Sequence, residues 1–133
     1  MKKQIQCLLF GMLFFSIAQV QAQDPANMAL LESTTPEERA QVQTELMQEK
    51  LQLEDTLSAN LNEINLKYAK KMEGVIKGDS SKWTKFRTAK RFDKEKDQEL
   101  QELFSKDQFK AYLKYKDRLK KDGKEKLQQL RQQ

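Results

Sequence analysis

The apolar residues that follow Thr35 recur at a spacing that only an α-helix brings to one face. Six apolar positions are separated by 4, 7, 4, 7 and 4 residues, and they are Val42, Leu46, Leu53, Leu57, Ile64 and Tyr68. An 11-residue repeat places about 3.67 residues in each turn, which is close to an undistorted helix. The spacing therefore predicts one long, nearly straight helix from Thr35 to about Met72.

A single helix of this kind cannot be stable alone, because its one apolar stripe has to be buried against other elements. The rest of the chain is suited to supplying them. Glu, Gln, Lys and Leu are frequent, whereas β-branched residues are few. Strong helix formers with few strand formers indicate an all-α protein. We expect a thin layer of long helices that forms a single domain over residues 34–133.

The first helix carries a clear start signal in the string TTPEER. Thr35 is a favourable N-cap, Pro36 suits the first helical position, and Glu38 stands three residues after the cap. Together they form a capping box, in which the side chains of Thr35 and Glu38 bond to each other's backbone N–H groups. The preceding segment, residues 23–33, has no sustained period and is interpreted as a mobile N-terminus of the exported chain.

A second start signal, FSKDQF, lies inside a stretch that otherwise has helical composition. Ser105 is the N-cap and Gln108 closes the box from the third helical position. Phe104 and Phe109 occupy the two positions of a hydrophobic staple, which fixes the angle at which the chain enters a helix. FSKDQF is therefore interpreted as a corner that ends one helix and begins the next.

The remaining boundaries are predicted from glycine and capping residues. Gly74 and Gly78 are expected to end the first helix, and Asp79 or Ser80 to cap a second helix that begins near Ser81. The middle of that second helix has little apolar content and is expected to be solvated or to face a polar partner. The third helix should stop at Asp122–Gly123, with a frayed end beyond it.

The N-terminus has the organisation of a secretory signal peptide. Lys2 and Lys3 precede an apolar run over residues 7–20, and Ala22 ends a small-residue cleavage site. About 14 apolar residues are fewer than the roughly 20 that span a bilayer as a helix. We expect residues 1–22 to be removed, which gives an exported, periplasmic protein without a membrane anchor.

The exported chain lacks the residues that most catalytic and metal sites use. The only cysteine of the sequence, Cys7, lies in the predicted signal peptide, and the sequence has no histidine. This argues against zinc and copper sites and against Cys-His or Ser-His catalysis. No phosphate-binding glycine loop is present either. We therefore expect no catalytic residue, no metal site, no cofactor and no enzymatic activity.

Charge is unevenly distributed along the chain, whose formal net charge is +5. Residues 31–66 carry eight acids and two bases, whereas residues 67–92 carry nine bases and two acids. Antiparallel self-association would bring these two regions together, an arrangement that favours orientation more than affinity.

The two corners together resemble the LTxxQ motif of the Spy and CpxP family of small helical periplasmic proteins. The similarity covers most of the exported chain. In the first copy Thr34 stands where the family has Leu and Glu38 where it has Gln; the second copy has Phe104 and Ser105 and keeps Gln108. The resemblance implies a thin, elongated hairpin of three to four long helices that forms a homodimer shaped as a curved cradle. Such a dimer holds unfolded or envelope proteins without ATP or restrains a stress sensor. Some relatives sense metals through histidines, which are absent from this chain.

A basic and aromatic stretch, KWTKFRTAKRF, is the candidate binding surface. Its candidate client-binding residues are Lys82, Trp83, Lys85, Phe86, Arg87, Lys90, Arg91 and Phe92. Aromatic side chains supply contact area and cations bind acidic segments. The competing interpretation places Trp83 and Phe86 in the core and the lysines on a solvated face. Phe92 lies on a different face of the helix and is expected to be exposed. Tyr112 and Tyr115 have helical spacing and are expected in the core.

Two function classes follow from these observations. The first is an ATP-independent, chaperone-like or envelope-stress binding protein. The second is a structural or adaptor protein that binds one defined envelope partner through helix-in-groove contacts. Nucleic-acid binding, which the basic stretch alone would suggest, conflicts with the predicted export of the chain.

Overall fold

The computed structural model describes residues 25–133, so the predicted signal peptide lies outside the described residues. The described part is entirely helical, with no β-strand between residues 25 and 133, which confirms the all-α class. Its elements are α1 (Pro25–Ser33), α2 (Pro36–Leu51), the 3₁₀ turn η1 (Asp55–Leu57), α3 (Ser58–Lys77), α4 (Lys82–Leu103) and α5 (Lys106–Arg131). These are five α-helices in place of the three to four expected.

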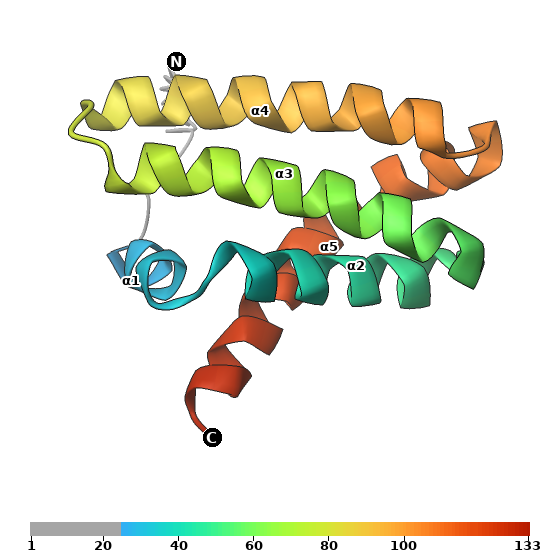
Figure 1. Cartoon of the computed structure of the whole chain (residues 1–133), viewed down its shortest axis with the longest axis horizontal. Helices are drawn as coiled ribbons and strands as arrows, with labels where there is room; N and C mark the ends of the chain where they lie inside the picture. The colour runs from blue at the N-terminus through green and yellow to red at the C-terminus, as the bar shows by residue number, and fades with distance from the viewer. Residues whose placement is uncertain (1–24) are drawn as a thin grey trace, which may run out of the picture.

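Helices α2, α3 and α4 form a layer in which α3 packs between the other two (Figure 1). Helix α5 leaves the corner after α4, crosses the layer and packs mainly on α2. Lys71 of α3 and Glu95 of α4 form an ion pair at 2.5 Å, and Lys67 pairs with Glu99. Because the residue numbers rise in α3 as they fall in α4, the two helices are an antiparallel pair.

The single long helix predicted between Thr35 and Met72 is wrong. The chain leaves α2 at Gln52, whose φ of 52° is left-handed, and the N–H of Leu53 donates to the carbonyl of Gln48 at 3.1 Å. This bond pattern ends a helix even without glycine. The buried side chain of Leu53 then turns into the core, and α3 runs back along α2. The 11-residue spacing is thus shared by two packed helices.

Replacement of Gln52 by glycine is expected to raise the free energy of unfolding by up to about 1 kcal/mol, because a left-handed residue with a Cβ costs roughly that much. Gln52→Val should lower the same free energy, since a β-branched side chain tolerates this conformation least. Urea denaturation followed by circular dichroism measures both changes. Equal stability of the two variants would contradict a left-handed break at this position.

Three other predicted boundaries need correction. Gly74 lies inside α3, and only Gly78 ends it. Ser81, one residue after the expected caps, is the N-cap of α4 and accepts the N–H of Thr84. Helix α5 continues through the buried Gly123 because Leu127, one turn further, packs into the core. In addition, α1 forms over part of the segment for which no element was expected.

Both capping boxes are confirmed. The N–H of Glu38 donates to Thr35 Oγ1 at 3.1 Å, and the N–H of Thr35 donates to Glu38 Oε2 at 2.8 Å. Pro36 is at the first helical position, as predicted. At the second corner the N–H of Gln108 donates to Ser105 Oγ at 3.2 Å, and the N–H of Ser105 donates to Gln108 Oε1 at 2.9 Å.

The two phenylalanines of the second corner meet on one ring. Phe104 is buried and its ring centroid lies 6.2 Å from that of Tyr112. Phe109 is half-buried and its centroid lies 5.9 Å from the same ring. Tyr112 is itself buried and donates to Asp97 at 2.7 Å. Burial raises the pKa of Tyr112, and the bond to Asp97 raises it further.

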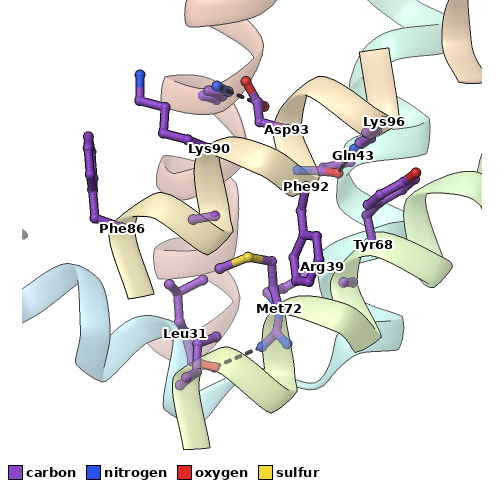
Figure 2. Close-up of a pocket in the computed structure, with 14 residues that line it drawn as sticks. Leu31, Arg39, Gln43, Tyr68, Met72, Phe86, Lys90, Phe92, Asp93 and Lys96 are labelled. Carbon is purple, nitrogen blue, oxygen red and sulfur yellow. Dashed lines mark hydrogen bonds and ion pairs between the residues drawn. The ribbon is translucent and has the colours of Figure 1, made fainter. Parts of the chain in front are cut away.

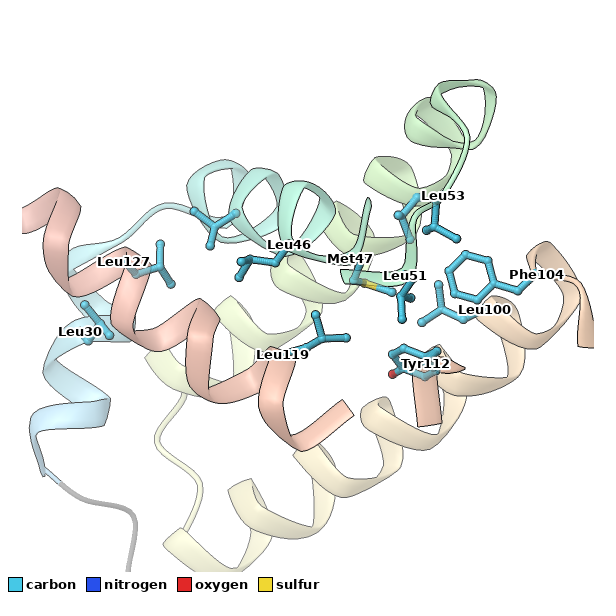
Figure 3. Packing of buried hydrophobic residues seen from close by; sticks show 12 residues of the cluster. Leu30, Leu46, Met47, Leu51, Leu53, Leu100, Phe104, Tyr112, Leu119 and Leu127 are labelled. Carbon is cyan, nitrogen blue, oxygen red and sulfur yellow. The ribbon is translucent and has the colours of Figure 1, made fainter. Parts of the chain in front are cut away.

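The hydrophobic core lies between α2, α5 and the ends of α3 and α4 that adjoin the corner (Figure 3). Leu61 of α3 and Leu100 of α4 are fully buried there. The first half of α4, residues 82–93, contributes no residue to this cluster. The middle of α4 faces a polar partner, which was one of the two expectations for it: Lys116 of α5 bonds to Asp93 at 2.7 Å and to Asp97 at 2.5 Å.

Candidate functional site

A cavity of about 390 Å³ lies toward the end of the helical layer that is distant from the hydrophobic core (Figure 2). Its walls come from α1, α2, α3, α4 and one residue of α5. The apolar part of the lining is Leu31, Tyr68, Ala69, Met72, Ile76, Phe86, Ala89 and Phe92. The charged and polar part is Arg39, Gln43, Lys90, Asp93, Lys96 and Lys120. A volume of this size suits a small ligand or a few side chains of a larger one.

The predicted basic and aromatic surface is divided by the structure between two sides of α4. Phe86, Lys90 and Phe92 line the cavity. Arg87 and Arg91 lie with two threonines in a shallow pocket, which the 100° rotation per residue places on the opposite side of the helix. The eight candidate residues therefore do not form one continuous contact surface.

Trp83 and Phe86 are both exposed, so the interpretation that placed them in the core is wrong. Phe86 lines the cavity, and the ring of Trp83 stacks on that of Phe86. Their side chains are 66% and 42% exposed, and their rings stack with centroids 5.9 Å apart. The physical reason is that α5 starts at the corner after α4 and runs away from the first turns of α4, whose main neighbour is α3. Two stacked, exposed aromatic rings are typical of a contact surface.

Phe92 is half-buried, although the sequence favoured its exposure. Its ring lies between α3 and α4, with Lys71 Nζ 4.4 Å and Arg91 Cζ 5.3 Å from the centroid. These distances are within the range of cation–π interactions. Phe92 therefore forms part of the cavity wall. Of the two tyrosines expected in the core, Tyr112 is buried and Tyr115 is exposed.

Two of the remaining candidate cations, Lys85 and Arg91, interact with other residues of the protein. Lys85 Nζ donates to the carbonyl of Ile76 at 3.0 Å, which satisfies one of the unpaired carbonyls at the end of α3. Arg91 Nε lies 3.6 Å from Glu95 of the same helix. Lys82 is exposed at the start of α4, and Lys90 Nζ lies 5.6 Å from the ring of Phe86.

Lys96 is one of several cavity residues that the sequence analysis missed, together with Arg39, Gln43, Asp93 and Lys120. The side chain of Lys96 is half-buried, and its ammonium donates to Gln43 Oε1 of α2 at 2.7 Å. Burial lowers the pKa of Lys96 to about 8, despite the opposing effect of Asp93 and Asp97. The available signal was periodicity, since Lys96 lies on the same side of α4 as Ala89, Phe92 and Asp93 at helical spacing.

Arg39 closes the cavity from α2 and serves the fold. Its guanidinium donates to the carbonyls of Leu31 at 2.8 Å and Thr34 at 2.5 Å, and it pairs with Glu73 of α3 at 2.5 Å. Three helices are thereby joined at one buried cation. Within residues 25–133 no group of three metal-binding side chains occurs, and no helix is long and apolar enough to cross a bilayer.

The sequence matches, over residues 22–112, a family described as a domain of unknown function (DUF4890). The match covers about two thirds of the chain. The chain belongs to the DUF4890 family. No curated protein and no solved structure matches it. The part shared with DUF4890 includes both capping boxes and all cavity residues except Lys120.

Proposed function

We propose that the protein is an exported, ATP-independent binding protein of the chaperone or envelope-stress type. The observation that carries the proposal is an exposed aromatic pair beside lysines at the mouth of an apolar cavity. We define the rim surface as Lys82, Trp83, Phe86 and Lys90. Unfolded chains present apolar side chains and carboxylates together, and the rim surface offers a partner for each.

Two further considerations support this proposal. The corners at Thr35 and Ser105 resemble the LTxxQ motif, whose family holds unfolding proteins without nucleotide. The predicted signal peptide would bring the protein to the periplasm, where unfolded envelope proteins occur and ATP is not supplied by the cytoplasm. We further propose that the protein acts as a homodimer, in which two rim surfaces would be combined.

The alternative is an adaptor that binds one envelope partner. The apolar cavity favours this function too, because a groove lined by Met72, Ile76 and Phe92 suits the apolar face of a helix. The two functions differ in specificity. A holding protein binds many unrelated clients, whereas an adaptor binds one.

Suppression of aggregation is the expected result for the exported chain. Several unrelated clients that unfold on heating or dilution should stay soluble at near-equimolar amounts without nucleotide, as measured by light scattering. The double variant Trp83→Ser, Phe86→Ser should lose most of this effect, because both side chains are exposed and their loss leaves the core intact. Activity toward no client would favour the adaptor.

A matched control is available on α5. Leu113 and Leu130 are 51% and 48% exposed and lie outside the cavity. The double variant Leu113→Ser, Leu130→Ser removes a similar amount of exposed apolar surface and should keep the activity. Equal loss in both double variants would contradict a role for the rim surface. Sedimentation of the exported chain tests the homodimer, which a strict monomer would exclude.

A further inference from the structure

The lining of the cavity has an excess of positive charge. Four cations and one carboxylate line it. Arg39 is bonded to Glu73, and Lys120 is bonded to Asp93 at 3.1 Å. Lys96 differs from these two, because the hydrogen bond found for its ammonium goes to the neutral side chain of Gln43.

The carboxylates near Lys96 are bonded to other cations. Asp93 accepts from Lys116 and Lys120, and Asp97 accepts from Lys116 and from the hydroxyl of Tyr112. Neither is within ion-pair distance of Lys96 among the described residues. A partly buried ammonium has three donors and gains most from an anionic acceptor. An anion that entered the cavity would supply it.

An apolar path leads from Lys96 toward the mouth. Phe92, Ala89 and Phe86 follow one another along α4, and Met72 and Ile76 of α3 line the same cavity. Figure 2 shows Phe92, Met72 and Phe86 among the lining residues. Lys96 and Phe86 are ten residues apart on α4, which corresponds to about 15 Å along the helix axis. This length and the volume of about 390 Å³ suit an acyl chain of medium length.

The lining also indicates which kind of occupant fits. An extended polypeptide buried here would need acceptors and donors for every N–H and C=O group, which a helix pairs internally but an extended chain does not. The apolar walls between Lys96 and Phe86 provide few. An acyl chain has no such groups, and its single carboxylate requires only one cation.

We propose that this cavity binds a medium-chain fatty acid, with its carboxylate on the ammonium of Lys96 and its acyl chain along Phe92, Met72 and Phe86. This ligand site goes beyond the proposed holding function, whose contacts are on the rim surface. The two have Phe86 in common, whereas Lys96 belongs to the ligand site alone. Either can be correct without the other.

Isothermal titration of the exported chain with laurate tests the site. One laurate is expected to bind per chain, whereas dodecanol and dodecyltrimethylammonium, which share the chain length but lack the anion, should bind at least about tenfold more weakly, the value of one charge-assisted hydrogen bond. Acetate, which has the anion without the chain, should give no heat. Equal binding of laurate and dodecanol, or binding of acetate as tight as laurate, would overturn the proposal.

Variants locate the head group. Lys96→Met keeps the aliphatic stem and removes the charge, so its affinity for laurate should fall by about tenfold or more. Lys94→Met makes the same change at an exposed position of α4 and should bind as the unchanged protein does. Circular dichroism of both variants verifies that they are folded. Unchanged laurate affinity in folded Lys96→Met would refute the assignment. Because no client protein is present, the result is independent of the aggregation assay.

Discussion

Phe104→Ala is expected to lower the free energy of unfolding by about 3 to 5 kcal/mol, the usual range for a buried phenylalanine. The side chain is only 6% exposed and packs in the core cluster with Leu100 and Tyr112. It also precedes the N-cap of α5, so its loss removes one half of the hydrophobic staple. Most of the stability of a domain of this size could be lost, since the total is commonly 5 to 15 kcal/mol.

Phe109→Ala should have a smaller effect, about 1 to 2 kcal/mol, because the ring is half-buried and its main partner is Tyr112. Urea denaturation followed by circular dichroism gives both values. Leu113→Ala is the control, since this exposed leucine one turn later should change stability by less than about 0.5 kcal/mol. Unchanged melting in both phenylalanine variants would remove the argument that the staple holds the corner.

The corners were predictable because their determinants are local. Thr35 and Glu38, or Ser105 and Gln108, meet across three residues of sequence, and the same short-range bonds form in the structure. The break at Gln52 was not predictable in this way. No glycine marks it, and its left-handed backbone is fixed by the packing of α3 on α2 and by the burial of Leu53. Such a turn depends on contacts between distant segments.

The sequence predicted several residue types of the candidate site but not their positions relative to one another. The stretch from Lys82 to Phe92 contains residues of the rim and the wall, yet the exposure of Trp83 depends on where α5 crosses the layer. That crossing follows from the corner angle and from the core around Leu100. Lys96 was missed because it lies in a highly charged section, in which only its position on the helix distinguishes it from its neighbours.

Three acidic residues of α2 form ion pairs whose partners the sequence did not predict. Glu37 lies 3.5 Å from Lys70, Glu45 lies 2.6 Å from Lys126, and Glu38 pairs with Arg131. These cations belong to the same chain, from α3 and α5. The charge of α2 is thus partly compensated within one chain, so the proposed homodimer would depend more on apolar surface such as the rim than on opposite charge.

Lys96→Met is expected to raise the free energy of unfolding at pH 7 by about 1 to 3 kcal/mol, because a partly buried charge without an anionic partner is replaced by an apolar side chain of similar length. Asp93 and Asp97 keep their bonds to Lys116, so the substitution leaves no carboxylate without a cation. The gain is reduced by the lost hydrogen bond to Gln43. Lys94→Met, on the exposed side, should change stability by less than about 0.5 kcal/mol.

The pH dependence distinguishes a charge effect from better packing. Burial lowers the pKa of Lys96 from 10.5 to about 8 in the folded protein, so the unfolded chain binds more protons between these two values. The free energy of unfolding of the unchanged protein should therefore rise relative to that of Lys96→Met as pH increases from about 8 toward 10.5. The difference in free energy that favours the methionine variant should shrink over the same interval. A constant advantage would mean that packing alone is responsible. A charge that lowers stability at neutral pH and faces an apolar cavity is expected where a ligand, rather than the fold, supplies its partner.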